Sequence, residues 1–168
     1  YVTTGSTYDD VNAAHPSTNT NDYDQYSMVK YDAFTLAKLG KWTAPPAPTG
    51  DPDFGSSPIL FDATINTAKV PMVGACNKDG YFYALRADTM QLVWKRQVGT
   101  AEIPGEVACL TGGVWDGSRL FVAGNTTKIG TKTFAGSVRR LNPATGAVVW
   151  ALGLNANPLG SGTVNRNG

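Results

Sequence analysis

The feature that most constrains the fold is a hairpin-like phrase that recurs along the chain. At residues 79–94 a short aromatic and apolar run is followed by a turn containing Thr89 and by a second β-prone run that includes Trp94. The same pattern returns at residues 136–150, with Thr145 in the turn and Trp150 at the end. Each phrase predicts an antiparallel hairpin, because two β-prone runs flank a short connection of turn residues.

A fainter copy lies at residues 26–42, and the aligned threonines Thr35, Thr89 and Thr145 are 54 and 56 residues apart. Strand-forming repeats with a period of roughly 50 residues indicate β-propeller blades. We therefore expect an all-β chain of about three four-stranded antiparallel blades, a partial propeller domain over 1–168. The predicted blade units are approximately 1–42, 53–99 and 107–154, with 155–168 beginning the next blade. Almost no helix is expected, because no segment has apolar residues at helical spacing.

The individual strands are predicted from β-prone runs and turn signals, at 57–61, 70–75, 81–86 and 91–97, and again at 107–110, 119–123, 136–141 and 147–152. Residues 6–25, including Asp24, and residues 125–133 are polar and are interpreted as loops. Propellers typically close with four to eight blades, so two radial faces of this chain need neighbours. We expect the remaining blades to come from the same polypeptide or from another chain.

Composition excludes several classes of function. Hydrophobic residues make up 42% of the chain and charged residues 16%, with a net charge of +1 and scattered Lys and Arg. This argues against a nucleic-acid surface, which needs a basic face. No apolar run approaches the length of a membrane span. The chain opens on Tyr1 without a secretory leader pattern, and we interpret it as a mature or truncated product.

Two cysteines, Cys76 and Cys109, lie 33 residues apart, without the spacing of a zinc site. They form either a disulfide or two small buried apolar side chains, and the sequence leaves both readings open.

The repeat resembles the tryptophan-docking repeat of pyrroloquinoline quinone (PQQ) propellers, in which the tryptophan packs near the Thr-Gly turn of the next blade. The fit is partial, because Arg86 and Asn142 replace an aspartate and Met90 replaces the first glycine. The segments 53–61, 73–85, 94–99 and 113–122 are more specific and resemble the quinoprotein alcohol dehydrogenases, most closely the polyvinyl-alcohol-dehydrogenase-like branch. The resemblance covers nearly the whole chain and implies an eight-bladed propeller with PQQ and calcium as cofactors.

The resemblance also implies roles for single residues. Asp53, before Phe54 and Gly55, matches the family's catalytic base, and a carboxylate suits this task because it can take a hydroxyl proton. Without the resemblance, Asp53 reads as a turn aspartate after Pro52. Lys78 matches the cation on the quinone oxygens, where positive charge stabilises developing negative charge. Its alternative is a solvated lysine in a hairpin turn.

Asn125 matches a third cofactor contact, but Asn125-Thr126-Thr127 is also a glycosylation sequon, and the two roles conflict. Ser6 stands where the family has a calcium-binding asparagine, and its hydroxyl is a poorer calcium ligand than an amide carbonyl. The family's haem motif and its vicinal cysteine pair are absent from the sequence.

Two hypotheses follow. The chain is a segment of a PQQ-dependent oxidoreductase that oxidises a small-molecule alcohol by base-assisted hydride transfer to the quinone, or it is a non-catalytic propeller that serves as a scaffold or interaction module. In either case we expect an extracellular or periplasmic protein that binds no nucleic acid. A carbohydrate-binding β-domain is a weaker third reading, because only the Trp and Tyr content favours it.

Overall fold

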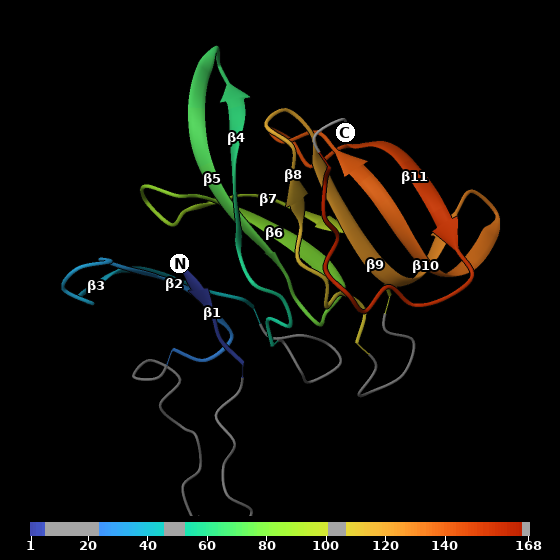
Figure 1. Cartoon of the computed structure of the whole chain (residues 1–168), viewed down its shortest axis with the longest axis horizontal. Coiled ribbons are helices and arrows are strands. Elements are labelled where there is room, and N and C mark those ends of the chain that lie inside the picture. The colour runs from blue at the N-terminus through green and yellow to red at the C-terminus, as the bar shows by residue number, and fades with distance from the viewer. Residues whose placement is uncertain (6–23, 46–52, 101–106, 166–168) are drawn as a thin grey trace, which may run out of the picture.

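The computed structural model describes residues 1–5, 24–45, 53–100 and 107–165. These residues contain strands and turns and no helix, and the strands form three separate antiparallel sheets (Figure 1). The sheets match propeller blades, which confirms the predicted all-β class.

Blade one has the strand order β1-β2-β3, formed by β1 (Val2–Thr3), β2 (Ser27–Tyr31) and β3 (Lys38–Thr43). Blade two has the order β4-β5-β6-β7, formed by β4 (Ile59–Ile65), β5 (Ala68–Cys76), β6 (Tyr81–Arg86) and β7 (Leu92–Gln97). Blade three has the order β8-β9-β10-β11, formed by β8 (Val114–Trp115), β9 (Leu120–Ile129), β10 (Lys132–Leu141) and β11 (Val148–Leu154).

Among the described residues blade one has three strands, and the other two blades have the predicted four. Two details of the prediction were wrong. Residues 107–110 form no strand, and the first strand of blade three is Val114–Trp115 instead. The polar stretch 125–133 belongs largely to a long hairpin, because its threonines alternate across the pleat and Gly130 provides the left-handed turn residue at φ 61°.

The last hairpin of each blade has a bulge at the same place, which identifies equivalent positions in the three blades. A bulge follows the pairs Lys30–Gly40, Ala84–Trp94 and Arg140–Trp150, so Gly40, Trp94 and Trp150 are equivalent. We call these three residues the docking positions.

The turn that precedes each docking position also has an equivalent residue with positive φ. These are Leu36 at 59°, Met90 at 60° and Gly146 at 67°. We call them the turn positions.

Trp94 joins blade two to blade three. Its indole Nε1 donates a hydrogen bond of 2.8 Å to the carbonyl of Pro143. A Cβ at Gly146 would lie 2.4 Å from the indole ring, so only glycine allows this approach. This confirms that the tryptophan docks on the Thr-Gly turn of the next blade. The indole also contacts Phe82, with ring centroids 5.8 Å apart, so the core of blade two continues into the junction.

A disulfide between Cys76 and Cys109 provides a second link between these blades, with Cα atoms 5.2 Å apart. Cys76 ends β5, and Cys109 lies in the segment that leads to β8. Of the two readings left open by the sequence, the structure shows the disulfide.

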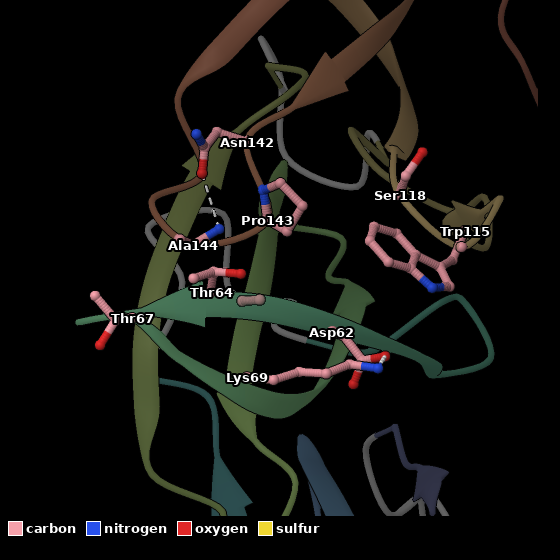
Figure 2. Close-up of a pocket in the computed structure, with 11 residues that line it drawn as sticks. Asp62, Thr64, Thr67, Lys69, Trp115, Ser118, Asn142, Pro143 and Ala144 are labelled. Atoms are coloured by element: carbon pink, nitrogen blue, oxygen red, sulfur yellow. Dashed lines mark hydrogen bonds and ion pairs between the residues drawn. The ribbon is translucent and has the colours of Figure 1, made fainter.

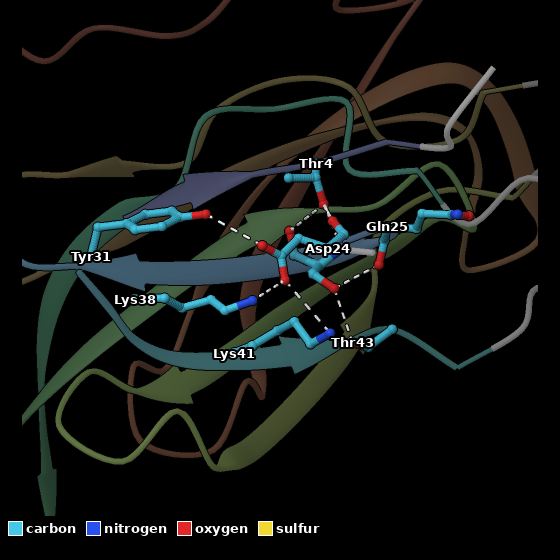
Figure 3. A network of polar contacts seen from close by, with 8 residues as sticks. Thr4, Asp24, Gln25, Tyr31, Lys38, Lys41 and Thr43 are labelled. Atoms are coloured by element: carbon cyan, nitrogen blue, oxygen red, sulfur yellow. Dashed lines mark hydrogen bonds and ion pairs between the residues drawn. The ribbon is translucent and has the colours of Figure 1, made fainter. Parts of the chain in front are cut away.

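Blade one is held at its edge by Asp24 (Figure 3). Its carboxylate lies 2.8 Å from the Lys38 Nζ atom and 3.6 Å from that of Lys41. The hydrogen bond and charge of Lys38 hold the pKa of Asp24 below its usual value. Asp24 lies outside the strands, as the loop interpretation predicts, but its carboxylate also links two lysines of β3 to the chain before β2.

Candidate functional site

The structure brings Asp53 and Lys78 into an ion pair, with the Lys78 Nζ atom 2.7 Å from Asp53 Oδ2. The side chains are 14% and 24% exposed, so the pair is largely shielded from solvent. The interpretations of Lys78 as a solvated hairpin lysine and of Asp53 as a simple turn aspartate are both incomplete, because each residue has a charged partner.

Local structure explains why these two side chains meet. Phe54 forms an isolated antiparallel bridge with Asn77, and the Lys78 N–H donates to the Asp53 carbonyl at 2.8 Å. The Asn77 side chain accepts a hydrogen bond of 3.0 Å from the Asp79 N–H, which closes the turn after β5. The backbone therefore fixes both charged residues before their side chains pair.

Asp53 also lies against the end of blade one. A Cβ at Gly5 would lie 3.0 Å from the Asp53 carboxyl carbon, so the missing side chain leaves room for the carboxylate. Ser6, the residue predicted at the calcium position, lies outside the described residues.

Asn125 lies in β9 and is 5% exposed. Its Nδ2 donates to the Val107 carbonyl at 2.6 Å, and its Oδ1 is buried without a hydrogen-bond partner in the described structure. A buried amide that is bonded within the fold cannot accept a glycan while the protein is folded. The sequon interpretation is therefore wrong for this conformation.

One run of backbone hydrogen bonds connects the three candidate residues. The Asp53 carbonyl accepts from Lys78, the Lys78 carbonyl accepts from Ala108 at 3.2 Å, and the Ala108 carbonyl accepts from Asn125 at 2.9 Å. The candidates thus lie at the same end of adjacent blades. A carboxylate beside an ammonium group, with an unsatisfied buried amide oxygen further along, is a set that can move a proton and bind an anionic or N–H-bearing ligand.

The fit to the implied cofactors is different for quinone and for calcium. Lys78 supplies a cation for carbonyl or carboxylate oxygens, and the Asn125 Oδ1 supplies an acceptor for an N–H group, so both fit PQQ. No group of three or more His, Cys, Asp or Glu side chains able to hold a metal is found among the residues that the structure places.

Sequence reasoning missed a buried acid beside this site. Burial raises the pKa of Asp79, and its Oδ2 accepts a 2.5 Å hydrogen bond from the Tyr83 hydroxyl. The pKa of Tyr83 is raised too, first by burial and then by its hydrogen bond to Asp79. Lys95 lies over the neighbouring Tyr81 ring, 4.6 Å from its centroid. The sequence signal that could have indicated this cluster is the alternation of side chains along a strand. It places Tyr81 and Tyr83 on one face of β6, the face on which Lys95 lies.

A groove of about 440 Å³ lies at the other end of blade two (Figure 2). It is bounded by the β4–β5 hairpin, with the ion pair of Asp62 and Lys69, and by Trp115 and Asn142 of blade three. Lys69, which lines the groove, and Lys78, at the candidate site, are separated by nine residues, a length of roughly 30 Å in an extended strand. None of the predicted site residues lines the groove.

Comparison with known proteins supports the architecture. The structure is similar to that of a europium-containing methanol dehydrogenase, with a TM-score of 0.59, 12% identity and coverage of 81% of this chain and 35% of that one. A quinohemoprotein alcohol dehydrogenase from Comamonas testosteroni matches with a TM-score of 0.55, 11% identity and coverage of 81% and 30%. The quinohemoprotein alcohol dehydrogenase ADHIIG from Pseudomonas putida HK5 matches with a TM-score of 0.56, 12% identity and coverage of 82% and 31%.

The chain thus spans about a third of the length of these solved structures. At such identities the similarity shows the fold alone. No protein-family model and no curated protein sequence matches the chain. No helix in the described residues is long and apolar enough to cross a membrane.

Proposed function

We propose that this chain is a segment of a quinoprotein-type oxidoreductase that oxidises a primary or secondary alcohol. The observation that carries the proposal is the shielded ion pair between Asp53 and Lys78, at 2.7 Å, in a fold shared with alcohol dehydrogenases. The polyvinyl-alcohol-dehydrogenase-like branch is part of this proposal and rests on the sequence resemblance.

Asp53 acts as the general base in this proposal. Its carboxylate accepts the proton of the substrate hydroxyl, and the Lys78 ammonium, 2.7 Å from Asp53 Oδ2, holds the carboxylate in place. When bound, PQQ supplies the two-electron acceptor for the carbon-bound hydrogen, which leaves as hydride. Asp53 would take the hydroxyl proton, and a bound PQQ would accept the hydride, so the alcohol would become a carbonyl compound.

Lys78 and Asn125 hold the cofactor in this proposal. Lys78 offers N–H donors to quinone oxygens, and Asn125 offers its buried Oδ1 to a donor on the ligand. A ligand N–H at this oxygen would remove the cost of about 1–3 kcal/mol that a buried acceptor without a partner imposes. Calcium at Ser6 remains a prediction.

The second hypothesis, a non-catalytic scaffold, draws on one specific observation. Lys78 already forms an ion pair with Asp53 Oδ2. The pair can therefore serve as a structural link between the segment before β4 and the turn after β5. A scaffold needs no free base, and this arrangement would serve it equally.

The compartment and the partners are also proposals. The Cys76–Cys109 disulfide supports an oxidising compartment, extracellular or periplasmic, because cytosolic thiols are kept reduced. The proposed partners are an alcohol substrate and the remaining propeller blades, from the same or another chain.

The test uses the intact protein with added PQQ and calcium and follows alcohol-dependent reduction of an electron-accepting dye. We expect turnover in the wild type and its loss in Asp53→Asn, with Asp88→Asn as a matched control because Asp88 forms an exposed ion pair with Arg86. PQQ binding without alcohol oxidation in the wild type would favour the scaffold.

A further inference from the structure

The groove between the β4–β5 hairpin and blade three has no part in the proposed alcohol oxidation (Figure 2). We infer that it binds a neutral polyhydroxylated ligand, a sugar ring or two, with the apolar face of the ligand on Trp115 and its hydroxyl groups on Asp62 and Lys69. The inference does not depend on the proposed enzymatic function.

The hairpin that forms one wall of the groove extends beyond the rest of its blade (Figure 1). β5 pairs with β6 only from Met72 onward, whereas its pairing with β4 continues back to Ala68. The two residues of the loop, Asn66 and Thr67, have φ values of 48° and 69°, which is the left-handed pair of a tight two-residue hairpin turn. The extension is therefore regular β structure up to its tip, although the four-stranded sheet does not require it.

Trp115 forms the facing wall, in blade three. Its ring packs on Phe61 of β4, with centroids 6.0 Å apart, so the core fixes the half-buried indole. None of the described residues accepts a hydrogen bond from its N–H. The equivalent residue of blade two is the aliphatic Leu60, because each is the second residue of its inner strand. An indole offers a flat apolar surface with a donor at its edge, and the C–H face of a sugar ring packs on such a surface.

The charges of the groove select a neutral ligand. Asp62 and Lys69 are the only charged residues among the described residues that line it, and they pair at 2.9 Å, so the lining has no net charge. The nearby Asp116 is paired with Arg119. An anion would be repelled by Asp62 and a cation by Lys69. Neighbouring hydroxyls suit both, because one can donate to the carboxylate while the other accepts from the ammonium group.

The size and access of the groove fit such a ligand. Its volume of about 440 Å³ lies within the range of about 300–1,000 Å³ that is usual for small-molecule sites. The side chains of Asp62 and Lys69 are 41% and 75% exposed, so a ligand can reach them from solvent. Thr64 adds a hydroxyl group to the same lining, and Pro143 adds an apolar ring.

The test observes Trp115 in the intact protein without PQQ, so that alcohol oxidation cannot contribute. The tryptophans are replaced by fluorotryptophan, the Trp115 fluorine resonance is assigned with W115F, and the protein is titrated with methyl β-glucoside. Glucuronate and glucosamine serve as the anionic and cationic sugars. The test variant is D62N/K69M, and the matched control is R86M/D88N, which removes another exposed ion pair of blade two that does not line the groove.

We expect the glucoside to shift the Trp115 resonance saturably in the wild type and in R86M/D88N. Its affinity should fall about tenfold or more in D62N/K69M, because charge-assisted hydrogen bonds are lost. Both charged sugars should bind more weakly than the glucoside. The inference would be overturned by an unshifted Trp115 resonance, by equal affinity in folded D62N/K69M, or by tighter binding of either charged sugar. If D62N/K69M does not fold, D62N alone replaces it.

Discussion

The turn after β5 and the middle of β9 occupy equivalent places in adjacent blades but differ in chemistry. Beyond the end of β5, Lys78 donates its backbone N–H to Asp53 and pairs with that residue's carboxylate. In β9 the equivalent Asn125 donates its backbone N–H to Ala108, and its amide bonds to the Val107 carbonyl. The repeat therefore fixes the backbone, while the side chains decide which blade carries charge.

Nearby hydroxyl groups confirm that the two places are equivalent. Ser56 Oγ accepts from the Cys76 N–H at 2.9 Å in blade two, and Thr111 Oγ1 donates to the Ala123 carbonyl at 3.0 Å in blade three. These contacts are structural and occur in both blades, whereas the ion pair occurs in blade two alone among the described residues. A difference on a shared framework points to function more strongly than the framework does.

The largest expected effect is on catalysis and comes from Asp53→Asn. The amide cannot take the hydroxyl proton, so dye-coupled alcohol oxidation should fall by roughly 100-fold or more, while the circular dichroism spectrum stays unchanged. Asn125→Asp, which alters the equivalent place in blade three, should lower activity less. Full activity in a folded Asp53→Asn protein would show that Asp53 is not the general base.

The next largest effect comes from the covalent link between the two places. Replacing Cys76 and Cys109 together by alanine should lower the free energy of unfolding by about 2–4 kcal/mol, measured by urea denaturation, because the unfolded chain regains its freedom. Reduction of the wild type with a thiol reagent should give a loss of similar size. An unchanged unfolding midpoint would show that the link carries no stability.

Lys78→Met should have an intermediate effect on stability. It leaves the Asp53 carboxylate, only 14% exposed, without its ammonium partner, which should cost about 1–3 kcal/mol at neutral pH. The double variant with Asp53→Asn should cost less than the sum of the single changes, because no charge then remains buried. Additive losses in this double-mutant cycle would mean that the two side chains do not interact in solution.

The smallest effect is a pH dependence from Asp79. Because burial raises its pKa in the folded state, Asp79 contributes most stability below its ordinary value of 3.8 and loses that contribution as pH rises through the raised pKa. Asp79→Asn keeps an oxygen acceptor for Tyr83 and removes the titration. The midpoint temperature of thermal denaturation should therefore fall less steeply between pH 4 and pH 7 in the variant than in the wild type. Identical slopes would contradict a raised pKa for Asp79.

Much of the fold could be predicted because the repeat is local. The hairpins around Thr89 and Thr145 were identified from β-prone runs and turn residues. The docking role of Trp94 was indicated by the family resemblance. Sequence patterns did not predict that residues 125–129 form part of a strand, because a polar Asn-Thr-Thr sequence resembles a loop when its burial is unknown. Composition alone does not reveal which polar residues face the interior.

The candidate site was predictable only in part. The family resemblance indicated Asp53, Lys78 and Asn125 separately, but no sequence spacing predicts that Lys78 reaches Asp53 across 25 residues. That contact depends on the bridge between Phe54 and Asn77, which is a tertiary feature. The contact between Gly40 and Met90, which would bring a Cβ at Gly40 to 3.0 Å from the Met90 side chain, is likewise tertiary and has no signal in the sequence.

The most direct test of the central claim is the binding of PQQ to the intact protein, measured by calorimetry in the presence of calcium. The account predicts saturable binding that weakens by about tenfold or more in Lys78→Met, since a charged contact is lost, and that is unchanged in Lys69→Met, which alters the distant groove. Equal affinities in wild type, Lys78→Met and Lys69→Met, or no binding by the wild type, would contradict it.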